Sequence, residues 1–156
     1  MTTLKGLPLK KEVEFRLIKH LTFLESELKD YVMFRTLSWK EYNTQRSKRR
    51  DVERWIENII NSTIDISKII LTAEGVSLPD TYKEVVEQLS LISGFHKQDM
   101  KKISEWVRLK NIISHEYLDI RWNSIKGFIA DTPPLFKRFS TWVKEYLQKR
   151  AEHIET

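Results

Sequence analysis

The amino-acid sequence predicts an all-α protein, an up-and-down bundle of five or six helices. Apolar residues recur at intervals of three and four along most of the 156-residue chain, the spacing of one helix face. The chain has four glycines and four prolines, too few for the turns of a loop-rich β protein. Its length fits one domain over residues 1–156 with a buried core.

The first expected helix runs over about Leu9–Phe34. Its apolar face is predicted to comprise Leu17, Leu21, Leu24, Leu28 and Tyr31. Ser38 and Glu41 have the spacing of a capping box, in which each side chain bonds the other residue's backbone N–H. We therefore expect a second helix to begin at Trp39.

The strongest periodic stretch lies in the region Trp39–Ala73 and ends before Gly75, a C-terminal cap. The pattern leaves open whether this region is one helix or two. It also contains a basic run that would oppose the helix dipole at an N-terminus: Arg46, Lys48, Arg49 and Arg50. We therefore expect a helix already under way at Arg46, with these charges solvated on its sides.

Four further helices are expected in the second half of the chain. A short helix over Pro79–Ile92 would begin on proline and end at Gly94, and an amphipathic helix over Lys97–Leu118 follows. A short helix over Ile120–Ile129 then precedes a Thr-Pro-Pro sequence at positions 132–134, which should start the last helix. The apolar face of that helix would comprise Leu135, Phe139, Val143, Tyr146 and Leu147.

Composition excludes several classes of protein. The absence of cysteine excludes disulfides and cysteine-based zinc sites, and fits a cytoplasmic location. No apolar run is long enough to span a membrane, and the N-terminus lacks the apolar region of a signal peptide. His20, His96 and His153 show no metal-ligand spacing, so we expect no metal and no cofactor. The net charge of +5 is compatible with an RNA substrate.

A polar stripe is expected late in the Lys97–Leu118 helix. Arg108 and His115 are seven residues apart, close to two helical turns, and Asn111 lies between them on the same face. Histidine can exchange a proton near neutral pH, and arginine keeps its charge and forks onto phosphate oxygens. An arginine and a histidine on one face are a minimal set of groups for cutting a phosphodiester without a metal.

Three stretches of the sequence resemble the HepT family of the HEPN superfamily, over roughly Arg50–Ile129. The first is R-R-D-V-E-R-W-I-E-N-I-I-N-S-T-I-D-I, which includes Glu53, Arg54 and Asp65. The second is L-P-D-T-Y-K-E-V-V-E-Q-L. The third is an R-x6-H-x-Y motif from Arg108 to Tyr117.

The resemblance implies a ribonuclease toxin that is paired with a nucleotidyltransferase antitoxin and acts as a homodimer. By position in the motif, Arg108 and His115 would be catalytic, and Asn111 would match a polar residue of the same helix. Tyr117 would match the tyrosine that the antitoxin modifies with AMP. Asp65 is a candidate for orienting a motif residue.

Two features of the motif complicate this assignment. Many relatives carry the arginine immediately before the asparagine, where this chain has Lys110. Helix geometry favours Arg108 as the phosphate-contacting cation, because Lys110 lies about 140° around an ideal helix from His115. Tyr117 would point about 200° away from His115 unless the helix loosens near Leu118.

Two other interpretations remain open at this stage. One is a non-catalytic HEPN module that docks a nucleotidyltransferase or holds a nucleotide. The other is a structural bundle that dimerises through an apolar face. The basic run beginning at Arg46 would suit either RNA or an acidic antitoxin surface.

Overall fold

A computed structural model describes residues 8–155, with the side chains of residues 152–155 left out of the description, so that His153 lies outside it. The described residues form eight α-helices and one 3₁₀-helix, with no strand. The helices are α1 Lys11–Lys29, α2 Tyr31–Phe34, α3 Trp39–Thr44, α4 Arg46–Ala73, α5 Tyr82–Gln88, η1 Leu89–Leu91, α6 Lys97–Trp106, α7 Leu109–His115 and α8 Leu118–Glu155. The prediction of an all-α bundle is confirmed.

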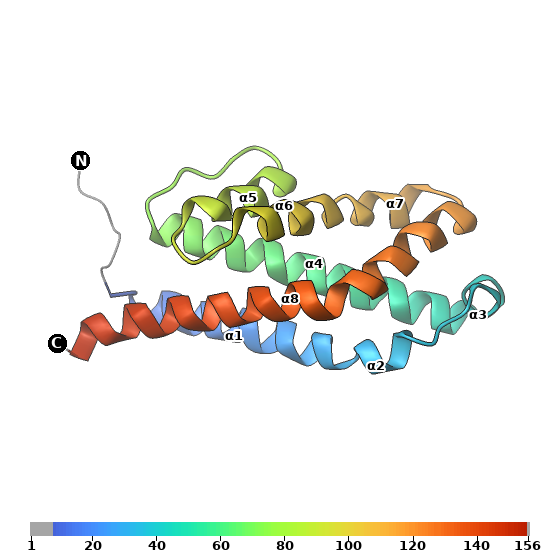
Figure 1. Cartoon of the computed structure of the whole chain (residues 1–156), viewed down its shortest axis with the longest axis horizontal. Helices are drawn as coiled ribbons and strands as arrows, with labels where there is room; N and C mark the ends of the chain where they lie inside the picture. The colour runs from blue at the N-terminus through green and yellow to red at the C-terminus, as the bar shows by residue number, and fades with distance from the viewer. Residues whose placement is uncertain (1–7, 156) are drawn as a thin grey trace.

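The long helices run up and down (Figure 1). Helices α1 and α2 run in one direction, α4 returns, α6 and α7 run in the first direction, and α8 returns to the starting end. Helix α4 contacts α1, α5 and α7, and α8 contacts α1, α6 and α7. None of the helices formed by the described residues is long and apolar enough to cross a membrane.

Helix α4 is the central helix of the core. Its apolar side chains at Val52, Trp55, Ile56 and Ile59 are nearly or fully buried. Each such side chain removed from water contributes about 1.5–3 kcal/mol. The buried hydroxyls of α4 are satisfied within the helix, by bonds to carbonyls three or four residues earlier, as at Ser62, Thr63 and Ser67.

The predicted capping box is present. Ser38 Oγ accepts from the backbone N–H of Glu41, whose carboxylate accepts from the backbone N–H of Ser38, and α3 begins at Trp39 as expected. The expected C-terminal cap of α4 is also present: Gly75 follows the cap residue with a φ of 74°, and the Val76 N–H donates to the Leu71 carbonyl. Each of these caps is formed by residues within a few positions of one another, so a short sequence pattern is enough to predict it.

The expected position of the basic run was wrong. The chain breaks at Gln45 (φ −108°, ψ 98°) and α4 begins at Arg46, so the run occupies an N-terminal turn. Two of the four charges have partners on α3: Arg49 Nη1 donates to the carbonyls of Tyr42 and Asn43 at 3.0 Å each, and Lys48 pairs with Glu41. The C-terminal carbonyls of α3 thus offset the unfavourable charge at the start of α4.

The predicted break before the last helix was also wrong. Helix α8 is continuous from Leu118 to Glu155, with Pro133 and Pro134 inside it. The two prolines remove the backbone donors that would reach the carbonyls of residues 129 and 130. Apolar side chains on both sides of the prolines, at Phe128 and Phe136, are fully buried, so packing keeps both segments in one helix. Figure 1 shows α8 bending between its orange and red segments.

Two other helices differ from the prediction at their ends. The first expected helix is divided at Asp30 into α1 and α2. The short helix does not begin on Pro79: Thr81 caps it through a bond from the Glu84 N–H (3.2 Å), and α5 begins at Tyr82. A side-chain cap supplies an acceptor for an otherwise unpaired N–H, which proline in the first turn does not.

Candidate active site

The polar stripe expected from the sequence is present on α7. Arg108, Asn111, Ser114 and His115 are exposed, whereas Leu109 on the opposite face is buried. No hydrogen bond or ion pair within the described part of the chain engages the side chain of Arg108, Asn111 or His115. A cation, an amide and an imidazole are therefore presented together to solvent.

The motif helix is not continuous, contrary to expectation. Helix α6 ends at Trp106 and α7 begins at Leu109, with Arg108 as its N-cap residue. Around the junction the backbone bonds span three residues and are long: 3.3 Å from the Arg108 N–H to the Glu105 carbonyl and 3.4 Å from the Lys110 N–H to the Val107 carbonyl. Such 3₁₀-type turns within a helix often mark functional sites.

Arg108 and Lys110 have different surroundings. Lys110 Nζ donates to Asn61 Oδ1 of α4 at 2.7 Å and lies 5.7 Å from the ring centroid of Tyr82. Arg108, like His115, is exposed. The lysine is used within the fold, whereas the arginine side chain is exposed and has no partner among the described residues.

Tyr117 lies in a two-residue corner between α7 and α8. Helix α7 ends at His115, and Glu116 has extended backbone (φ −96°, ψ 161°). The Tyr117 side chain is 81% exposed. The rotation of about 200° expected for a continuous helix therefore does not apply, because the helix stops before Tyr117.

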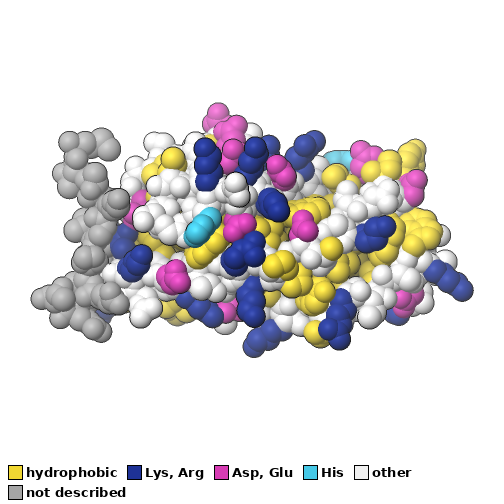
Figure 2. Space-filling model, viewed as in Figure 1, with side chains coloured by type: hydrophobic (Ala, Val, Ile, Leu, Met, Phe, Trp, Pro, Cys, Tyr) yellow, Lys and Arg dark blue, Asp and Glu magenta, His cyan; other side chains and the backbone are white. Residues whose placement is uncertain are grey.

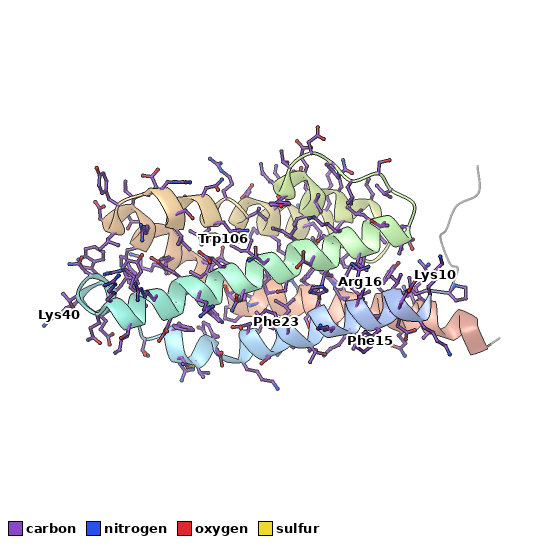
Figure 3. All side chains as sticks on the ribbon, turned by 180° about the vertical axis from the view of Figure 1, so that it is seen from behind. Lys10, Phe15, Arg16, Phe23, Lys40 and Trp106 are labelled. Atoms are coloured by element: carbon purple, nitrogen blue, oxygen red, sulfur yellow. The ribbon has the colours of Figure 1, made fainter. Side chains whose placement is uncertain are left out.

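Asp65 lies on the face of α4 that packs against α1. Its carboxylate is 3.9 Å from His20 Nδ1 of α1, and no hydrogen bond or ion pair of the described residues links it to Arg108 or His115. Both Asp65 and His20 line a cavity of about 740 Å³ between α1 and α4. Figure 3 shows Lys10 and Arg16, which also line this cavity, at the end of the bundle opposite Lys40 and α3. Within one chain, the structure does not bring Asp65 together with the motif.

The surface carries no large area of one charge on the face shown in Figure 2, where basic and acidic side chains are interspersed. The described residues contain no group of three or more histidine and carboxylate side chains that could hold a metal ion.

The chain matches the family model "Ribonuclease HepT-like" over residues 19–142. This match covers most of the chain and includes α7, the corner and the larger part of α8. The chain belongs to the HepT-like ribonuclease family. No curated protein matches it.

One part of this HepT-like site was not found from the sequence. Behind the corner, Glu53 of α4 accepts hydrogen bonds from Tyr42 (2.5 Å) and from Arg121 Nη1 of α8 (3.2 Å). Arg121 Nε also donates to the backbone carbonyl of Glu116 at 2.7 Å. Glu53 lies in one of the stretches that resemble the family, but nothing in the sequence pairs it with Arg121, which is 68 residues away.

Proposed function

We propose that this HepT-like chain is a ribonuclease toxin that cuts RNA without a metal ion, using Arg108 and His115. The observation that carries the proposal is the exposed stripe on α7, where both side chains face solvent without a partner among the described residues. Exposed polar groups that have no partner within the protein are available to a ligand. The family match supports ribonuclease activity in general terms.

In the proposed reaction the ribose 2′-oxygen attacks the adjacent phosphorus. The new O2′–P bond forms as the P–O5′ bond breaks, which leaves a 2′,3′-cyclic phosphate and a free 5′-hydroxyl. His115 takes the 2′-hydroxyl proton or gives a proton to the leaving 5′-oxygen. Arg108 stabilises the negative charge that builds on the phosphoryl oxygens. Because attack needs the 2′-hydroxyl, the substrate is RNA.

One chain supplies a single histidine on this stripe, so we propose that a homodimer supplies both base and acid. Mixing wild-type chains with an excess of His115→Ala chains tests this. If each dimer needs both histidines, activity will fall with the square of the wild-type fraction. A linear fall would show that one subunit is sufficient.

The main test compares wild type with His115→Ala on RNA in excess chelator. We expect the wild type to release cyclic-phosphate products, and the variant to lose cleavage while keeping its circular-dichroism spectrum. A 2′-deoxy substrate is the matched control and should remain intact. An active His115→Ala, or a wild type that needs a divalent ion, would refute the mechanism, and an inert wild type would favour a docking module.

We further propose that a nucleotidyltransferase antitoxin neutralises the toxin by adding AMP to Tyr117. The exposed phenol in the corner supports this role, since a phosphate there would introduce charge and bulk beside His115. Mass spectrometry after co-expression with the transferase should find the mass of AMP on Tyr117. Tyr117→Phe should stay unmodified and should still cut RNA in the presence of the transferase.

A further inference from the structure

The backbone around His115 has few anchors. Helix α7 has seven residues, and its start is held by the long, three-residue-spaced bonds at Arg108 and Lys110. Of its apolar side chains, Leu109 and Ile113 are buried. At its other end the Glu116 carbonyl accepts from Arg121 Nε at 2.7 Å. Lys110 ties the start of α7 to Asn61 of α4, and the bond from Arg121 holds the residue directly after His115.

Arg121 is itself held by a half-buried carboxylate. The side chains of Arg121 and Glu53 are 23% and 15% exposed, so solvent screens their pairing only in part. Tyr42 is fully buried and donates to the same carboxylate oxygen, and the Trp122 ring packs 5.4 Å from the Tyr42 ring. Burial, and then the bond to Glu53, raise the pKa of Tyr42 above its ordinary value.

A guanidinium suits this position because of its shape. Its Nη1 binds the carboxylate while its Nε binds the carbonyl, so one planar group joins α4 to the corner. The Arg121 backbone N–H also donates to the Tyr117 carbonyl at 2.9 Å. Displacement of the Glu53 carboxylate would therefore be transmitted through the Arg121 side chain to the Glu116 carbonyl, next to His115.

We propose that Glu53 is a positioning residue for the ribonuclease reaction: through Arg121 it sets where His115 lies relative to the substrate. The inference rests on the proposed function, since it assumes that His115 transfers a proton. Misplacing a reacting group by about 1 Å can cost about 100-fold in rate, so a small shift of the corner is enough to matter.

The test measures kcat and KM for RNA cleavage by wild type and Glu53→Gln. Glutamine keeps the shape and can still accept from Tyr42, but it loses the charge that holds Arg121. We expect kcat to fall at least about 10-fold while KM changes less than about twofold. A kcat within about twofold of wild type would overturn the proposal.

Asp99→Asn is the matched control. Asp99 binds Arg138 of α8 through two bonds of 2.9 and 3.0 Å, so this change also breaks a carboxylate–arginine pair between α8 and another helix. It lies away from the corner and should leave kcat within about twofold of wild type. An equal loss of kcat in both variants would mean that general loosening of α8 explains the effect, and would overturn the proposal.

Arg121→Lys separates positioning from charge. Lysine keeps the positive charge but cannot bind the carboxylate and the carbonyl with one planar fork. We expect it to lower kcat about as much as Glu53→Gln. Wild-type kcat in Arg121→Lys would show that charge alone suffices and that the bridge is not needed.

An NMR measurement makes failure of this inference distinct from failure of the proposed function. The imidazole C–H signals of His115, assigned with His115→Gln, should be single in wild type and in Asp99→Asn. They should broaden or split in Glu53→Gln. If wild type cuts no RNA, the proposed function fails while these spectra still report on the corner. Unchanged signals in Glu53→Gln would overturn the positioning role.

Discussion

Helix α4 and the pair α6–α7 lie side by side in the bundle, but their backbones are built differently. Helix α4 runs for 28 residues without interruption, and its buried hydroxyls bond back to its own carbonyls. The α6–α7 pair is interrupted in the middle of the sequence motif, and the side chains of Arg108, Asn111 and His115 have no partner among the described residues. The buried hydroxyls of α4 are thus satisfied within their own helix, whereas the stripe from Arg108 to His115 keeps three polar side chains exposed to solvent.

The largest expected effect concerns α4. Ile59→Ala removes a fully buried side chain from the middle of the core and should lower the free energy of unfolding by about 2–5 kcal/mol. Urea unfolding followed by circular dichroism measures it. Ser114→Ala, at an exposed position on α7, is the control and should stay within about 0.5 kcal/mol of wild type. If both variants lost the same free energy of unfolding, the contrast between the buried core of α4 and the exposed stripe on α7 would be wrong.

Next in size is the effect of Arg108 on cleavage. Arg108→Ala should lower kcat/KM for RNA about 100-fold, or about 2.7 kcal/mol in transition-state stabilisation, with little change in stability. Lys110→Ala should lower kcat/KM less than about threefold, since Lys110 binds Asn61. Initial-rate kinetics on both variants decide the matter. The reverse order would identify Lys110 as the cation that contacts phosphate.

Hydrogen exchange should show directly that the backbone is less protected at the start of α7 than in the middle of α4. The amides of Lys110 and Ile112 donate bonds of 3.4 and 3.3 Å at the interruption, so they should be protected at least about 10-fold less than amides in the middle of α4. Native-state exchange followed by NMR or mass spectrometry gives both values. Equal protection would mean that the interruption opens only with the whole fold.

The smallest expected effect is a pH dependence at Asp99. The hydrogen bond from Arg138 lowers the pKa of this carboxyl, so its pairing stabilises the fold above the ordinary carboxyl pKa and is lost as pH falls through the lowered value. Arg138 is about half exposed, which limits the contribution to about 0.5–1 kcal/mol. Asp99→Asn should therefore be less stable than wild type at pH 7 by that amount. This difference in stability between wild type and Asp99→Asn should vanish in acid, where the carboxyl is protonated. A difference that persisted in acid would show that it does not come from the charge of Asp99.

Local signals account for most of what could be predicted. The capping box at Ser38, the cap glycine at position 75 and the apolar stripe of α4 all depend on neighbours within a few residues. The exposed stripe from Arg108 to His115 was also predictable, because Leu109 and Ile113 show which face is buried.

The remaining features depend on contacts that are distant in sequence. The prolines of α8 stay in a helix because buried side chains on both sides pack against the core, which no local rule reports. The bridge from Glu53 to Arg121 joins residues 68 positions apart. The corner at Tyr117 could be anticipated only as a requirement for exposing the phenol. The extended backbone of the corner follows from the end of α7 at His115, which the sequence did not predict.

The non-helical backbone at Glu116 and Tyr117 has one further consequence. A side chain within a helix can be reached by a modifying enzyme only from its own face, and a closer approach requires unwinding. Tyr117 stands on two residues of non-helical chain, and its ring is almost entirely in water. A covalent group could be attached there, and removed again, without melting a single turn of α7 or α8.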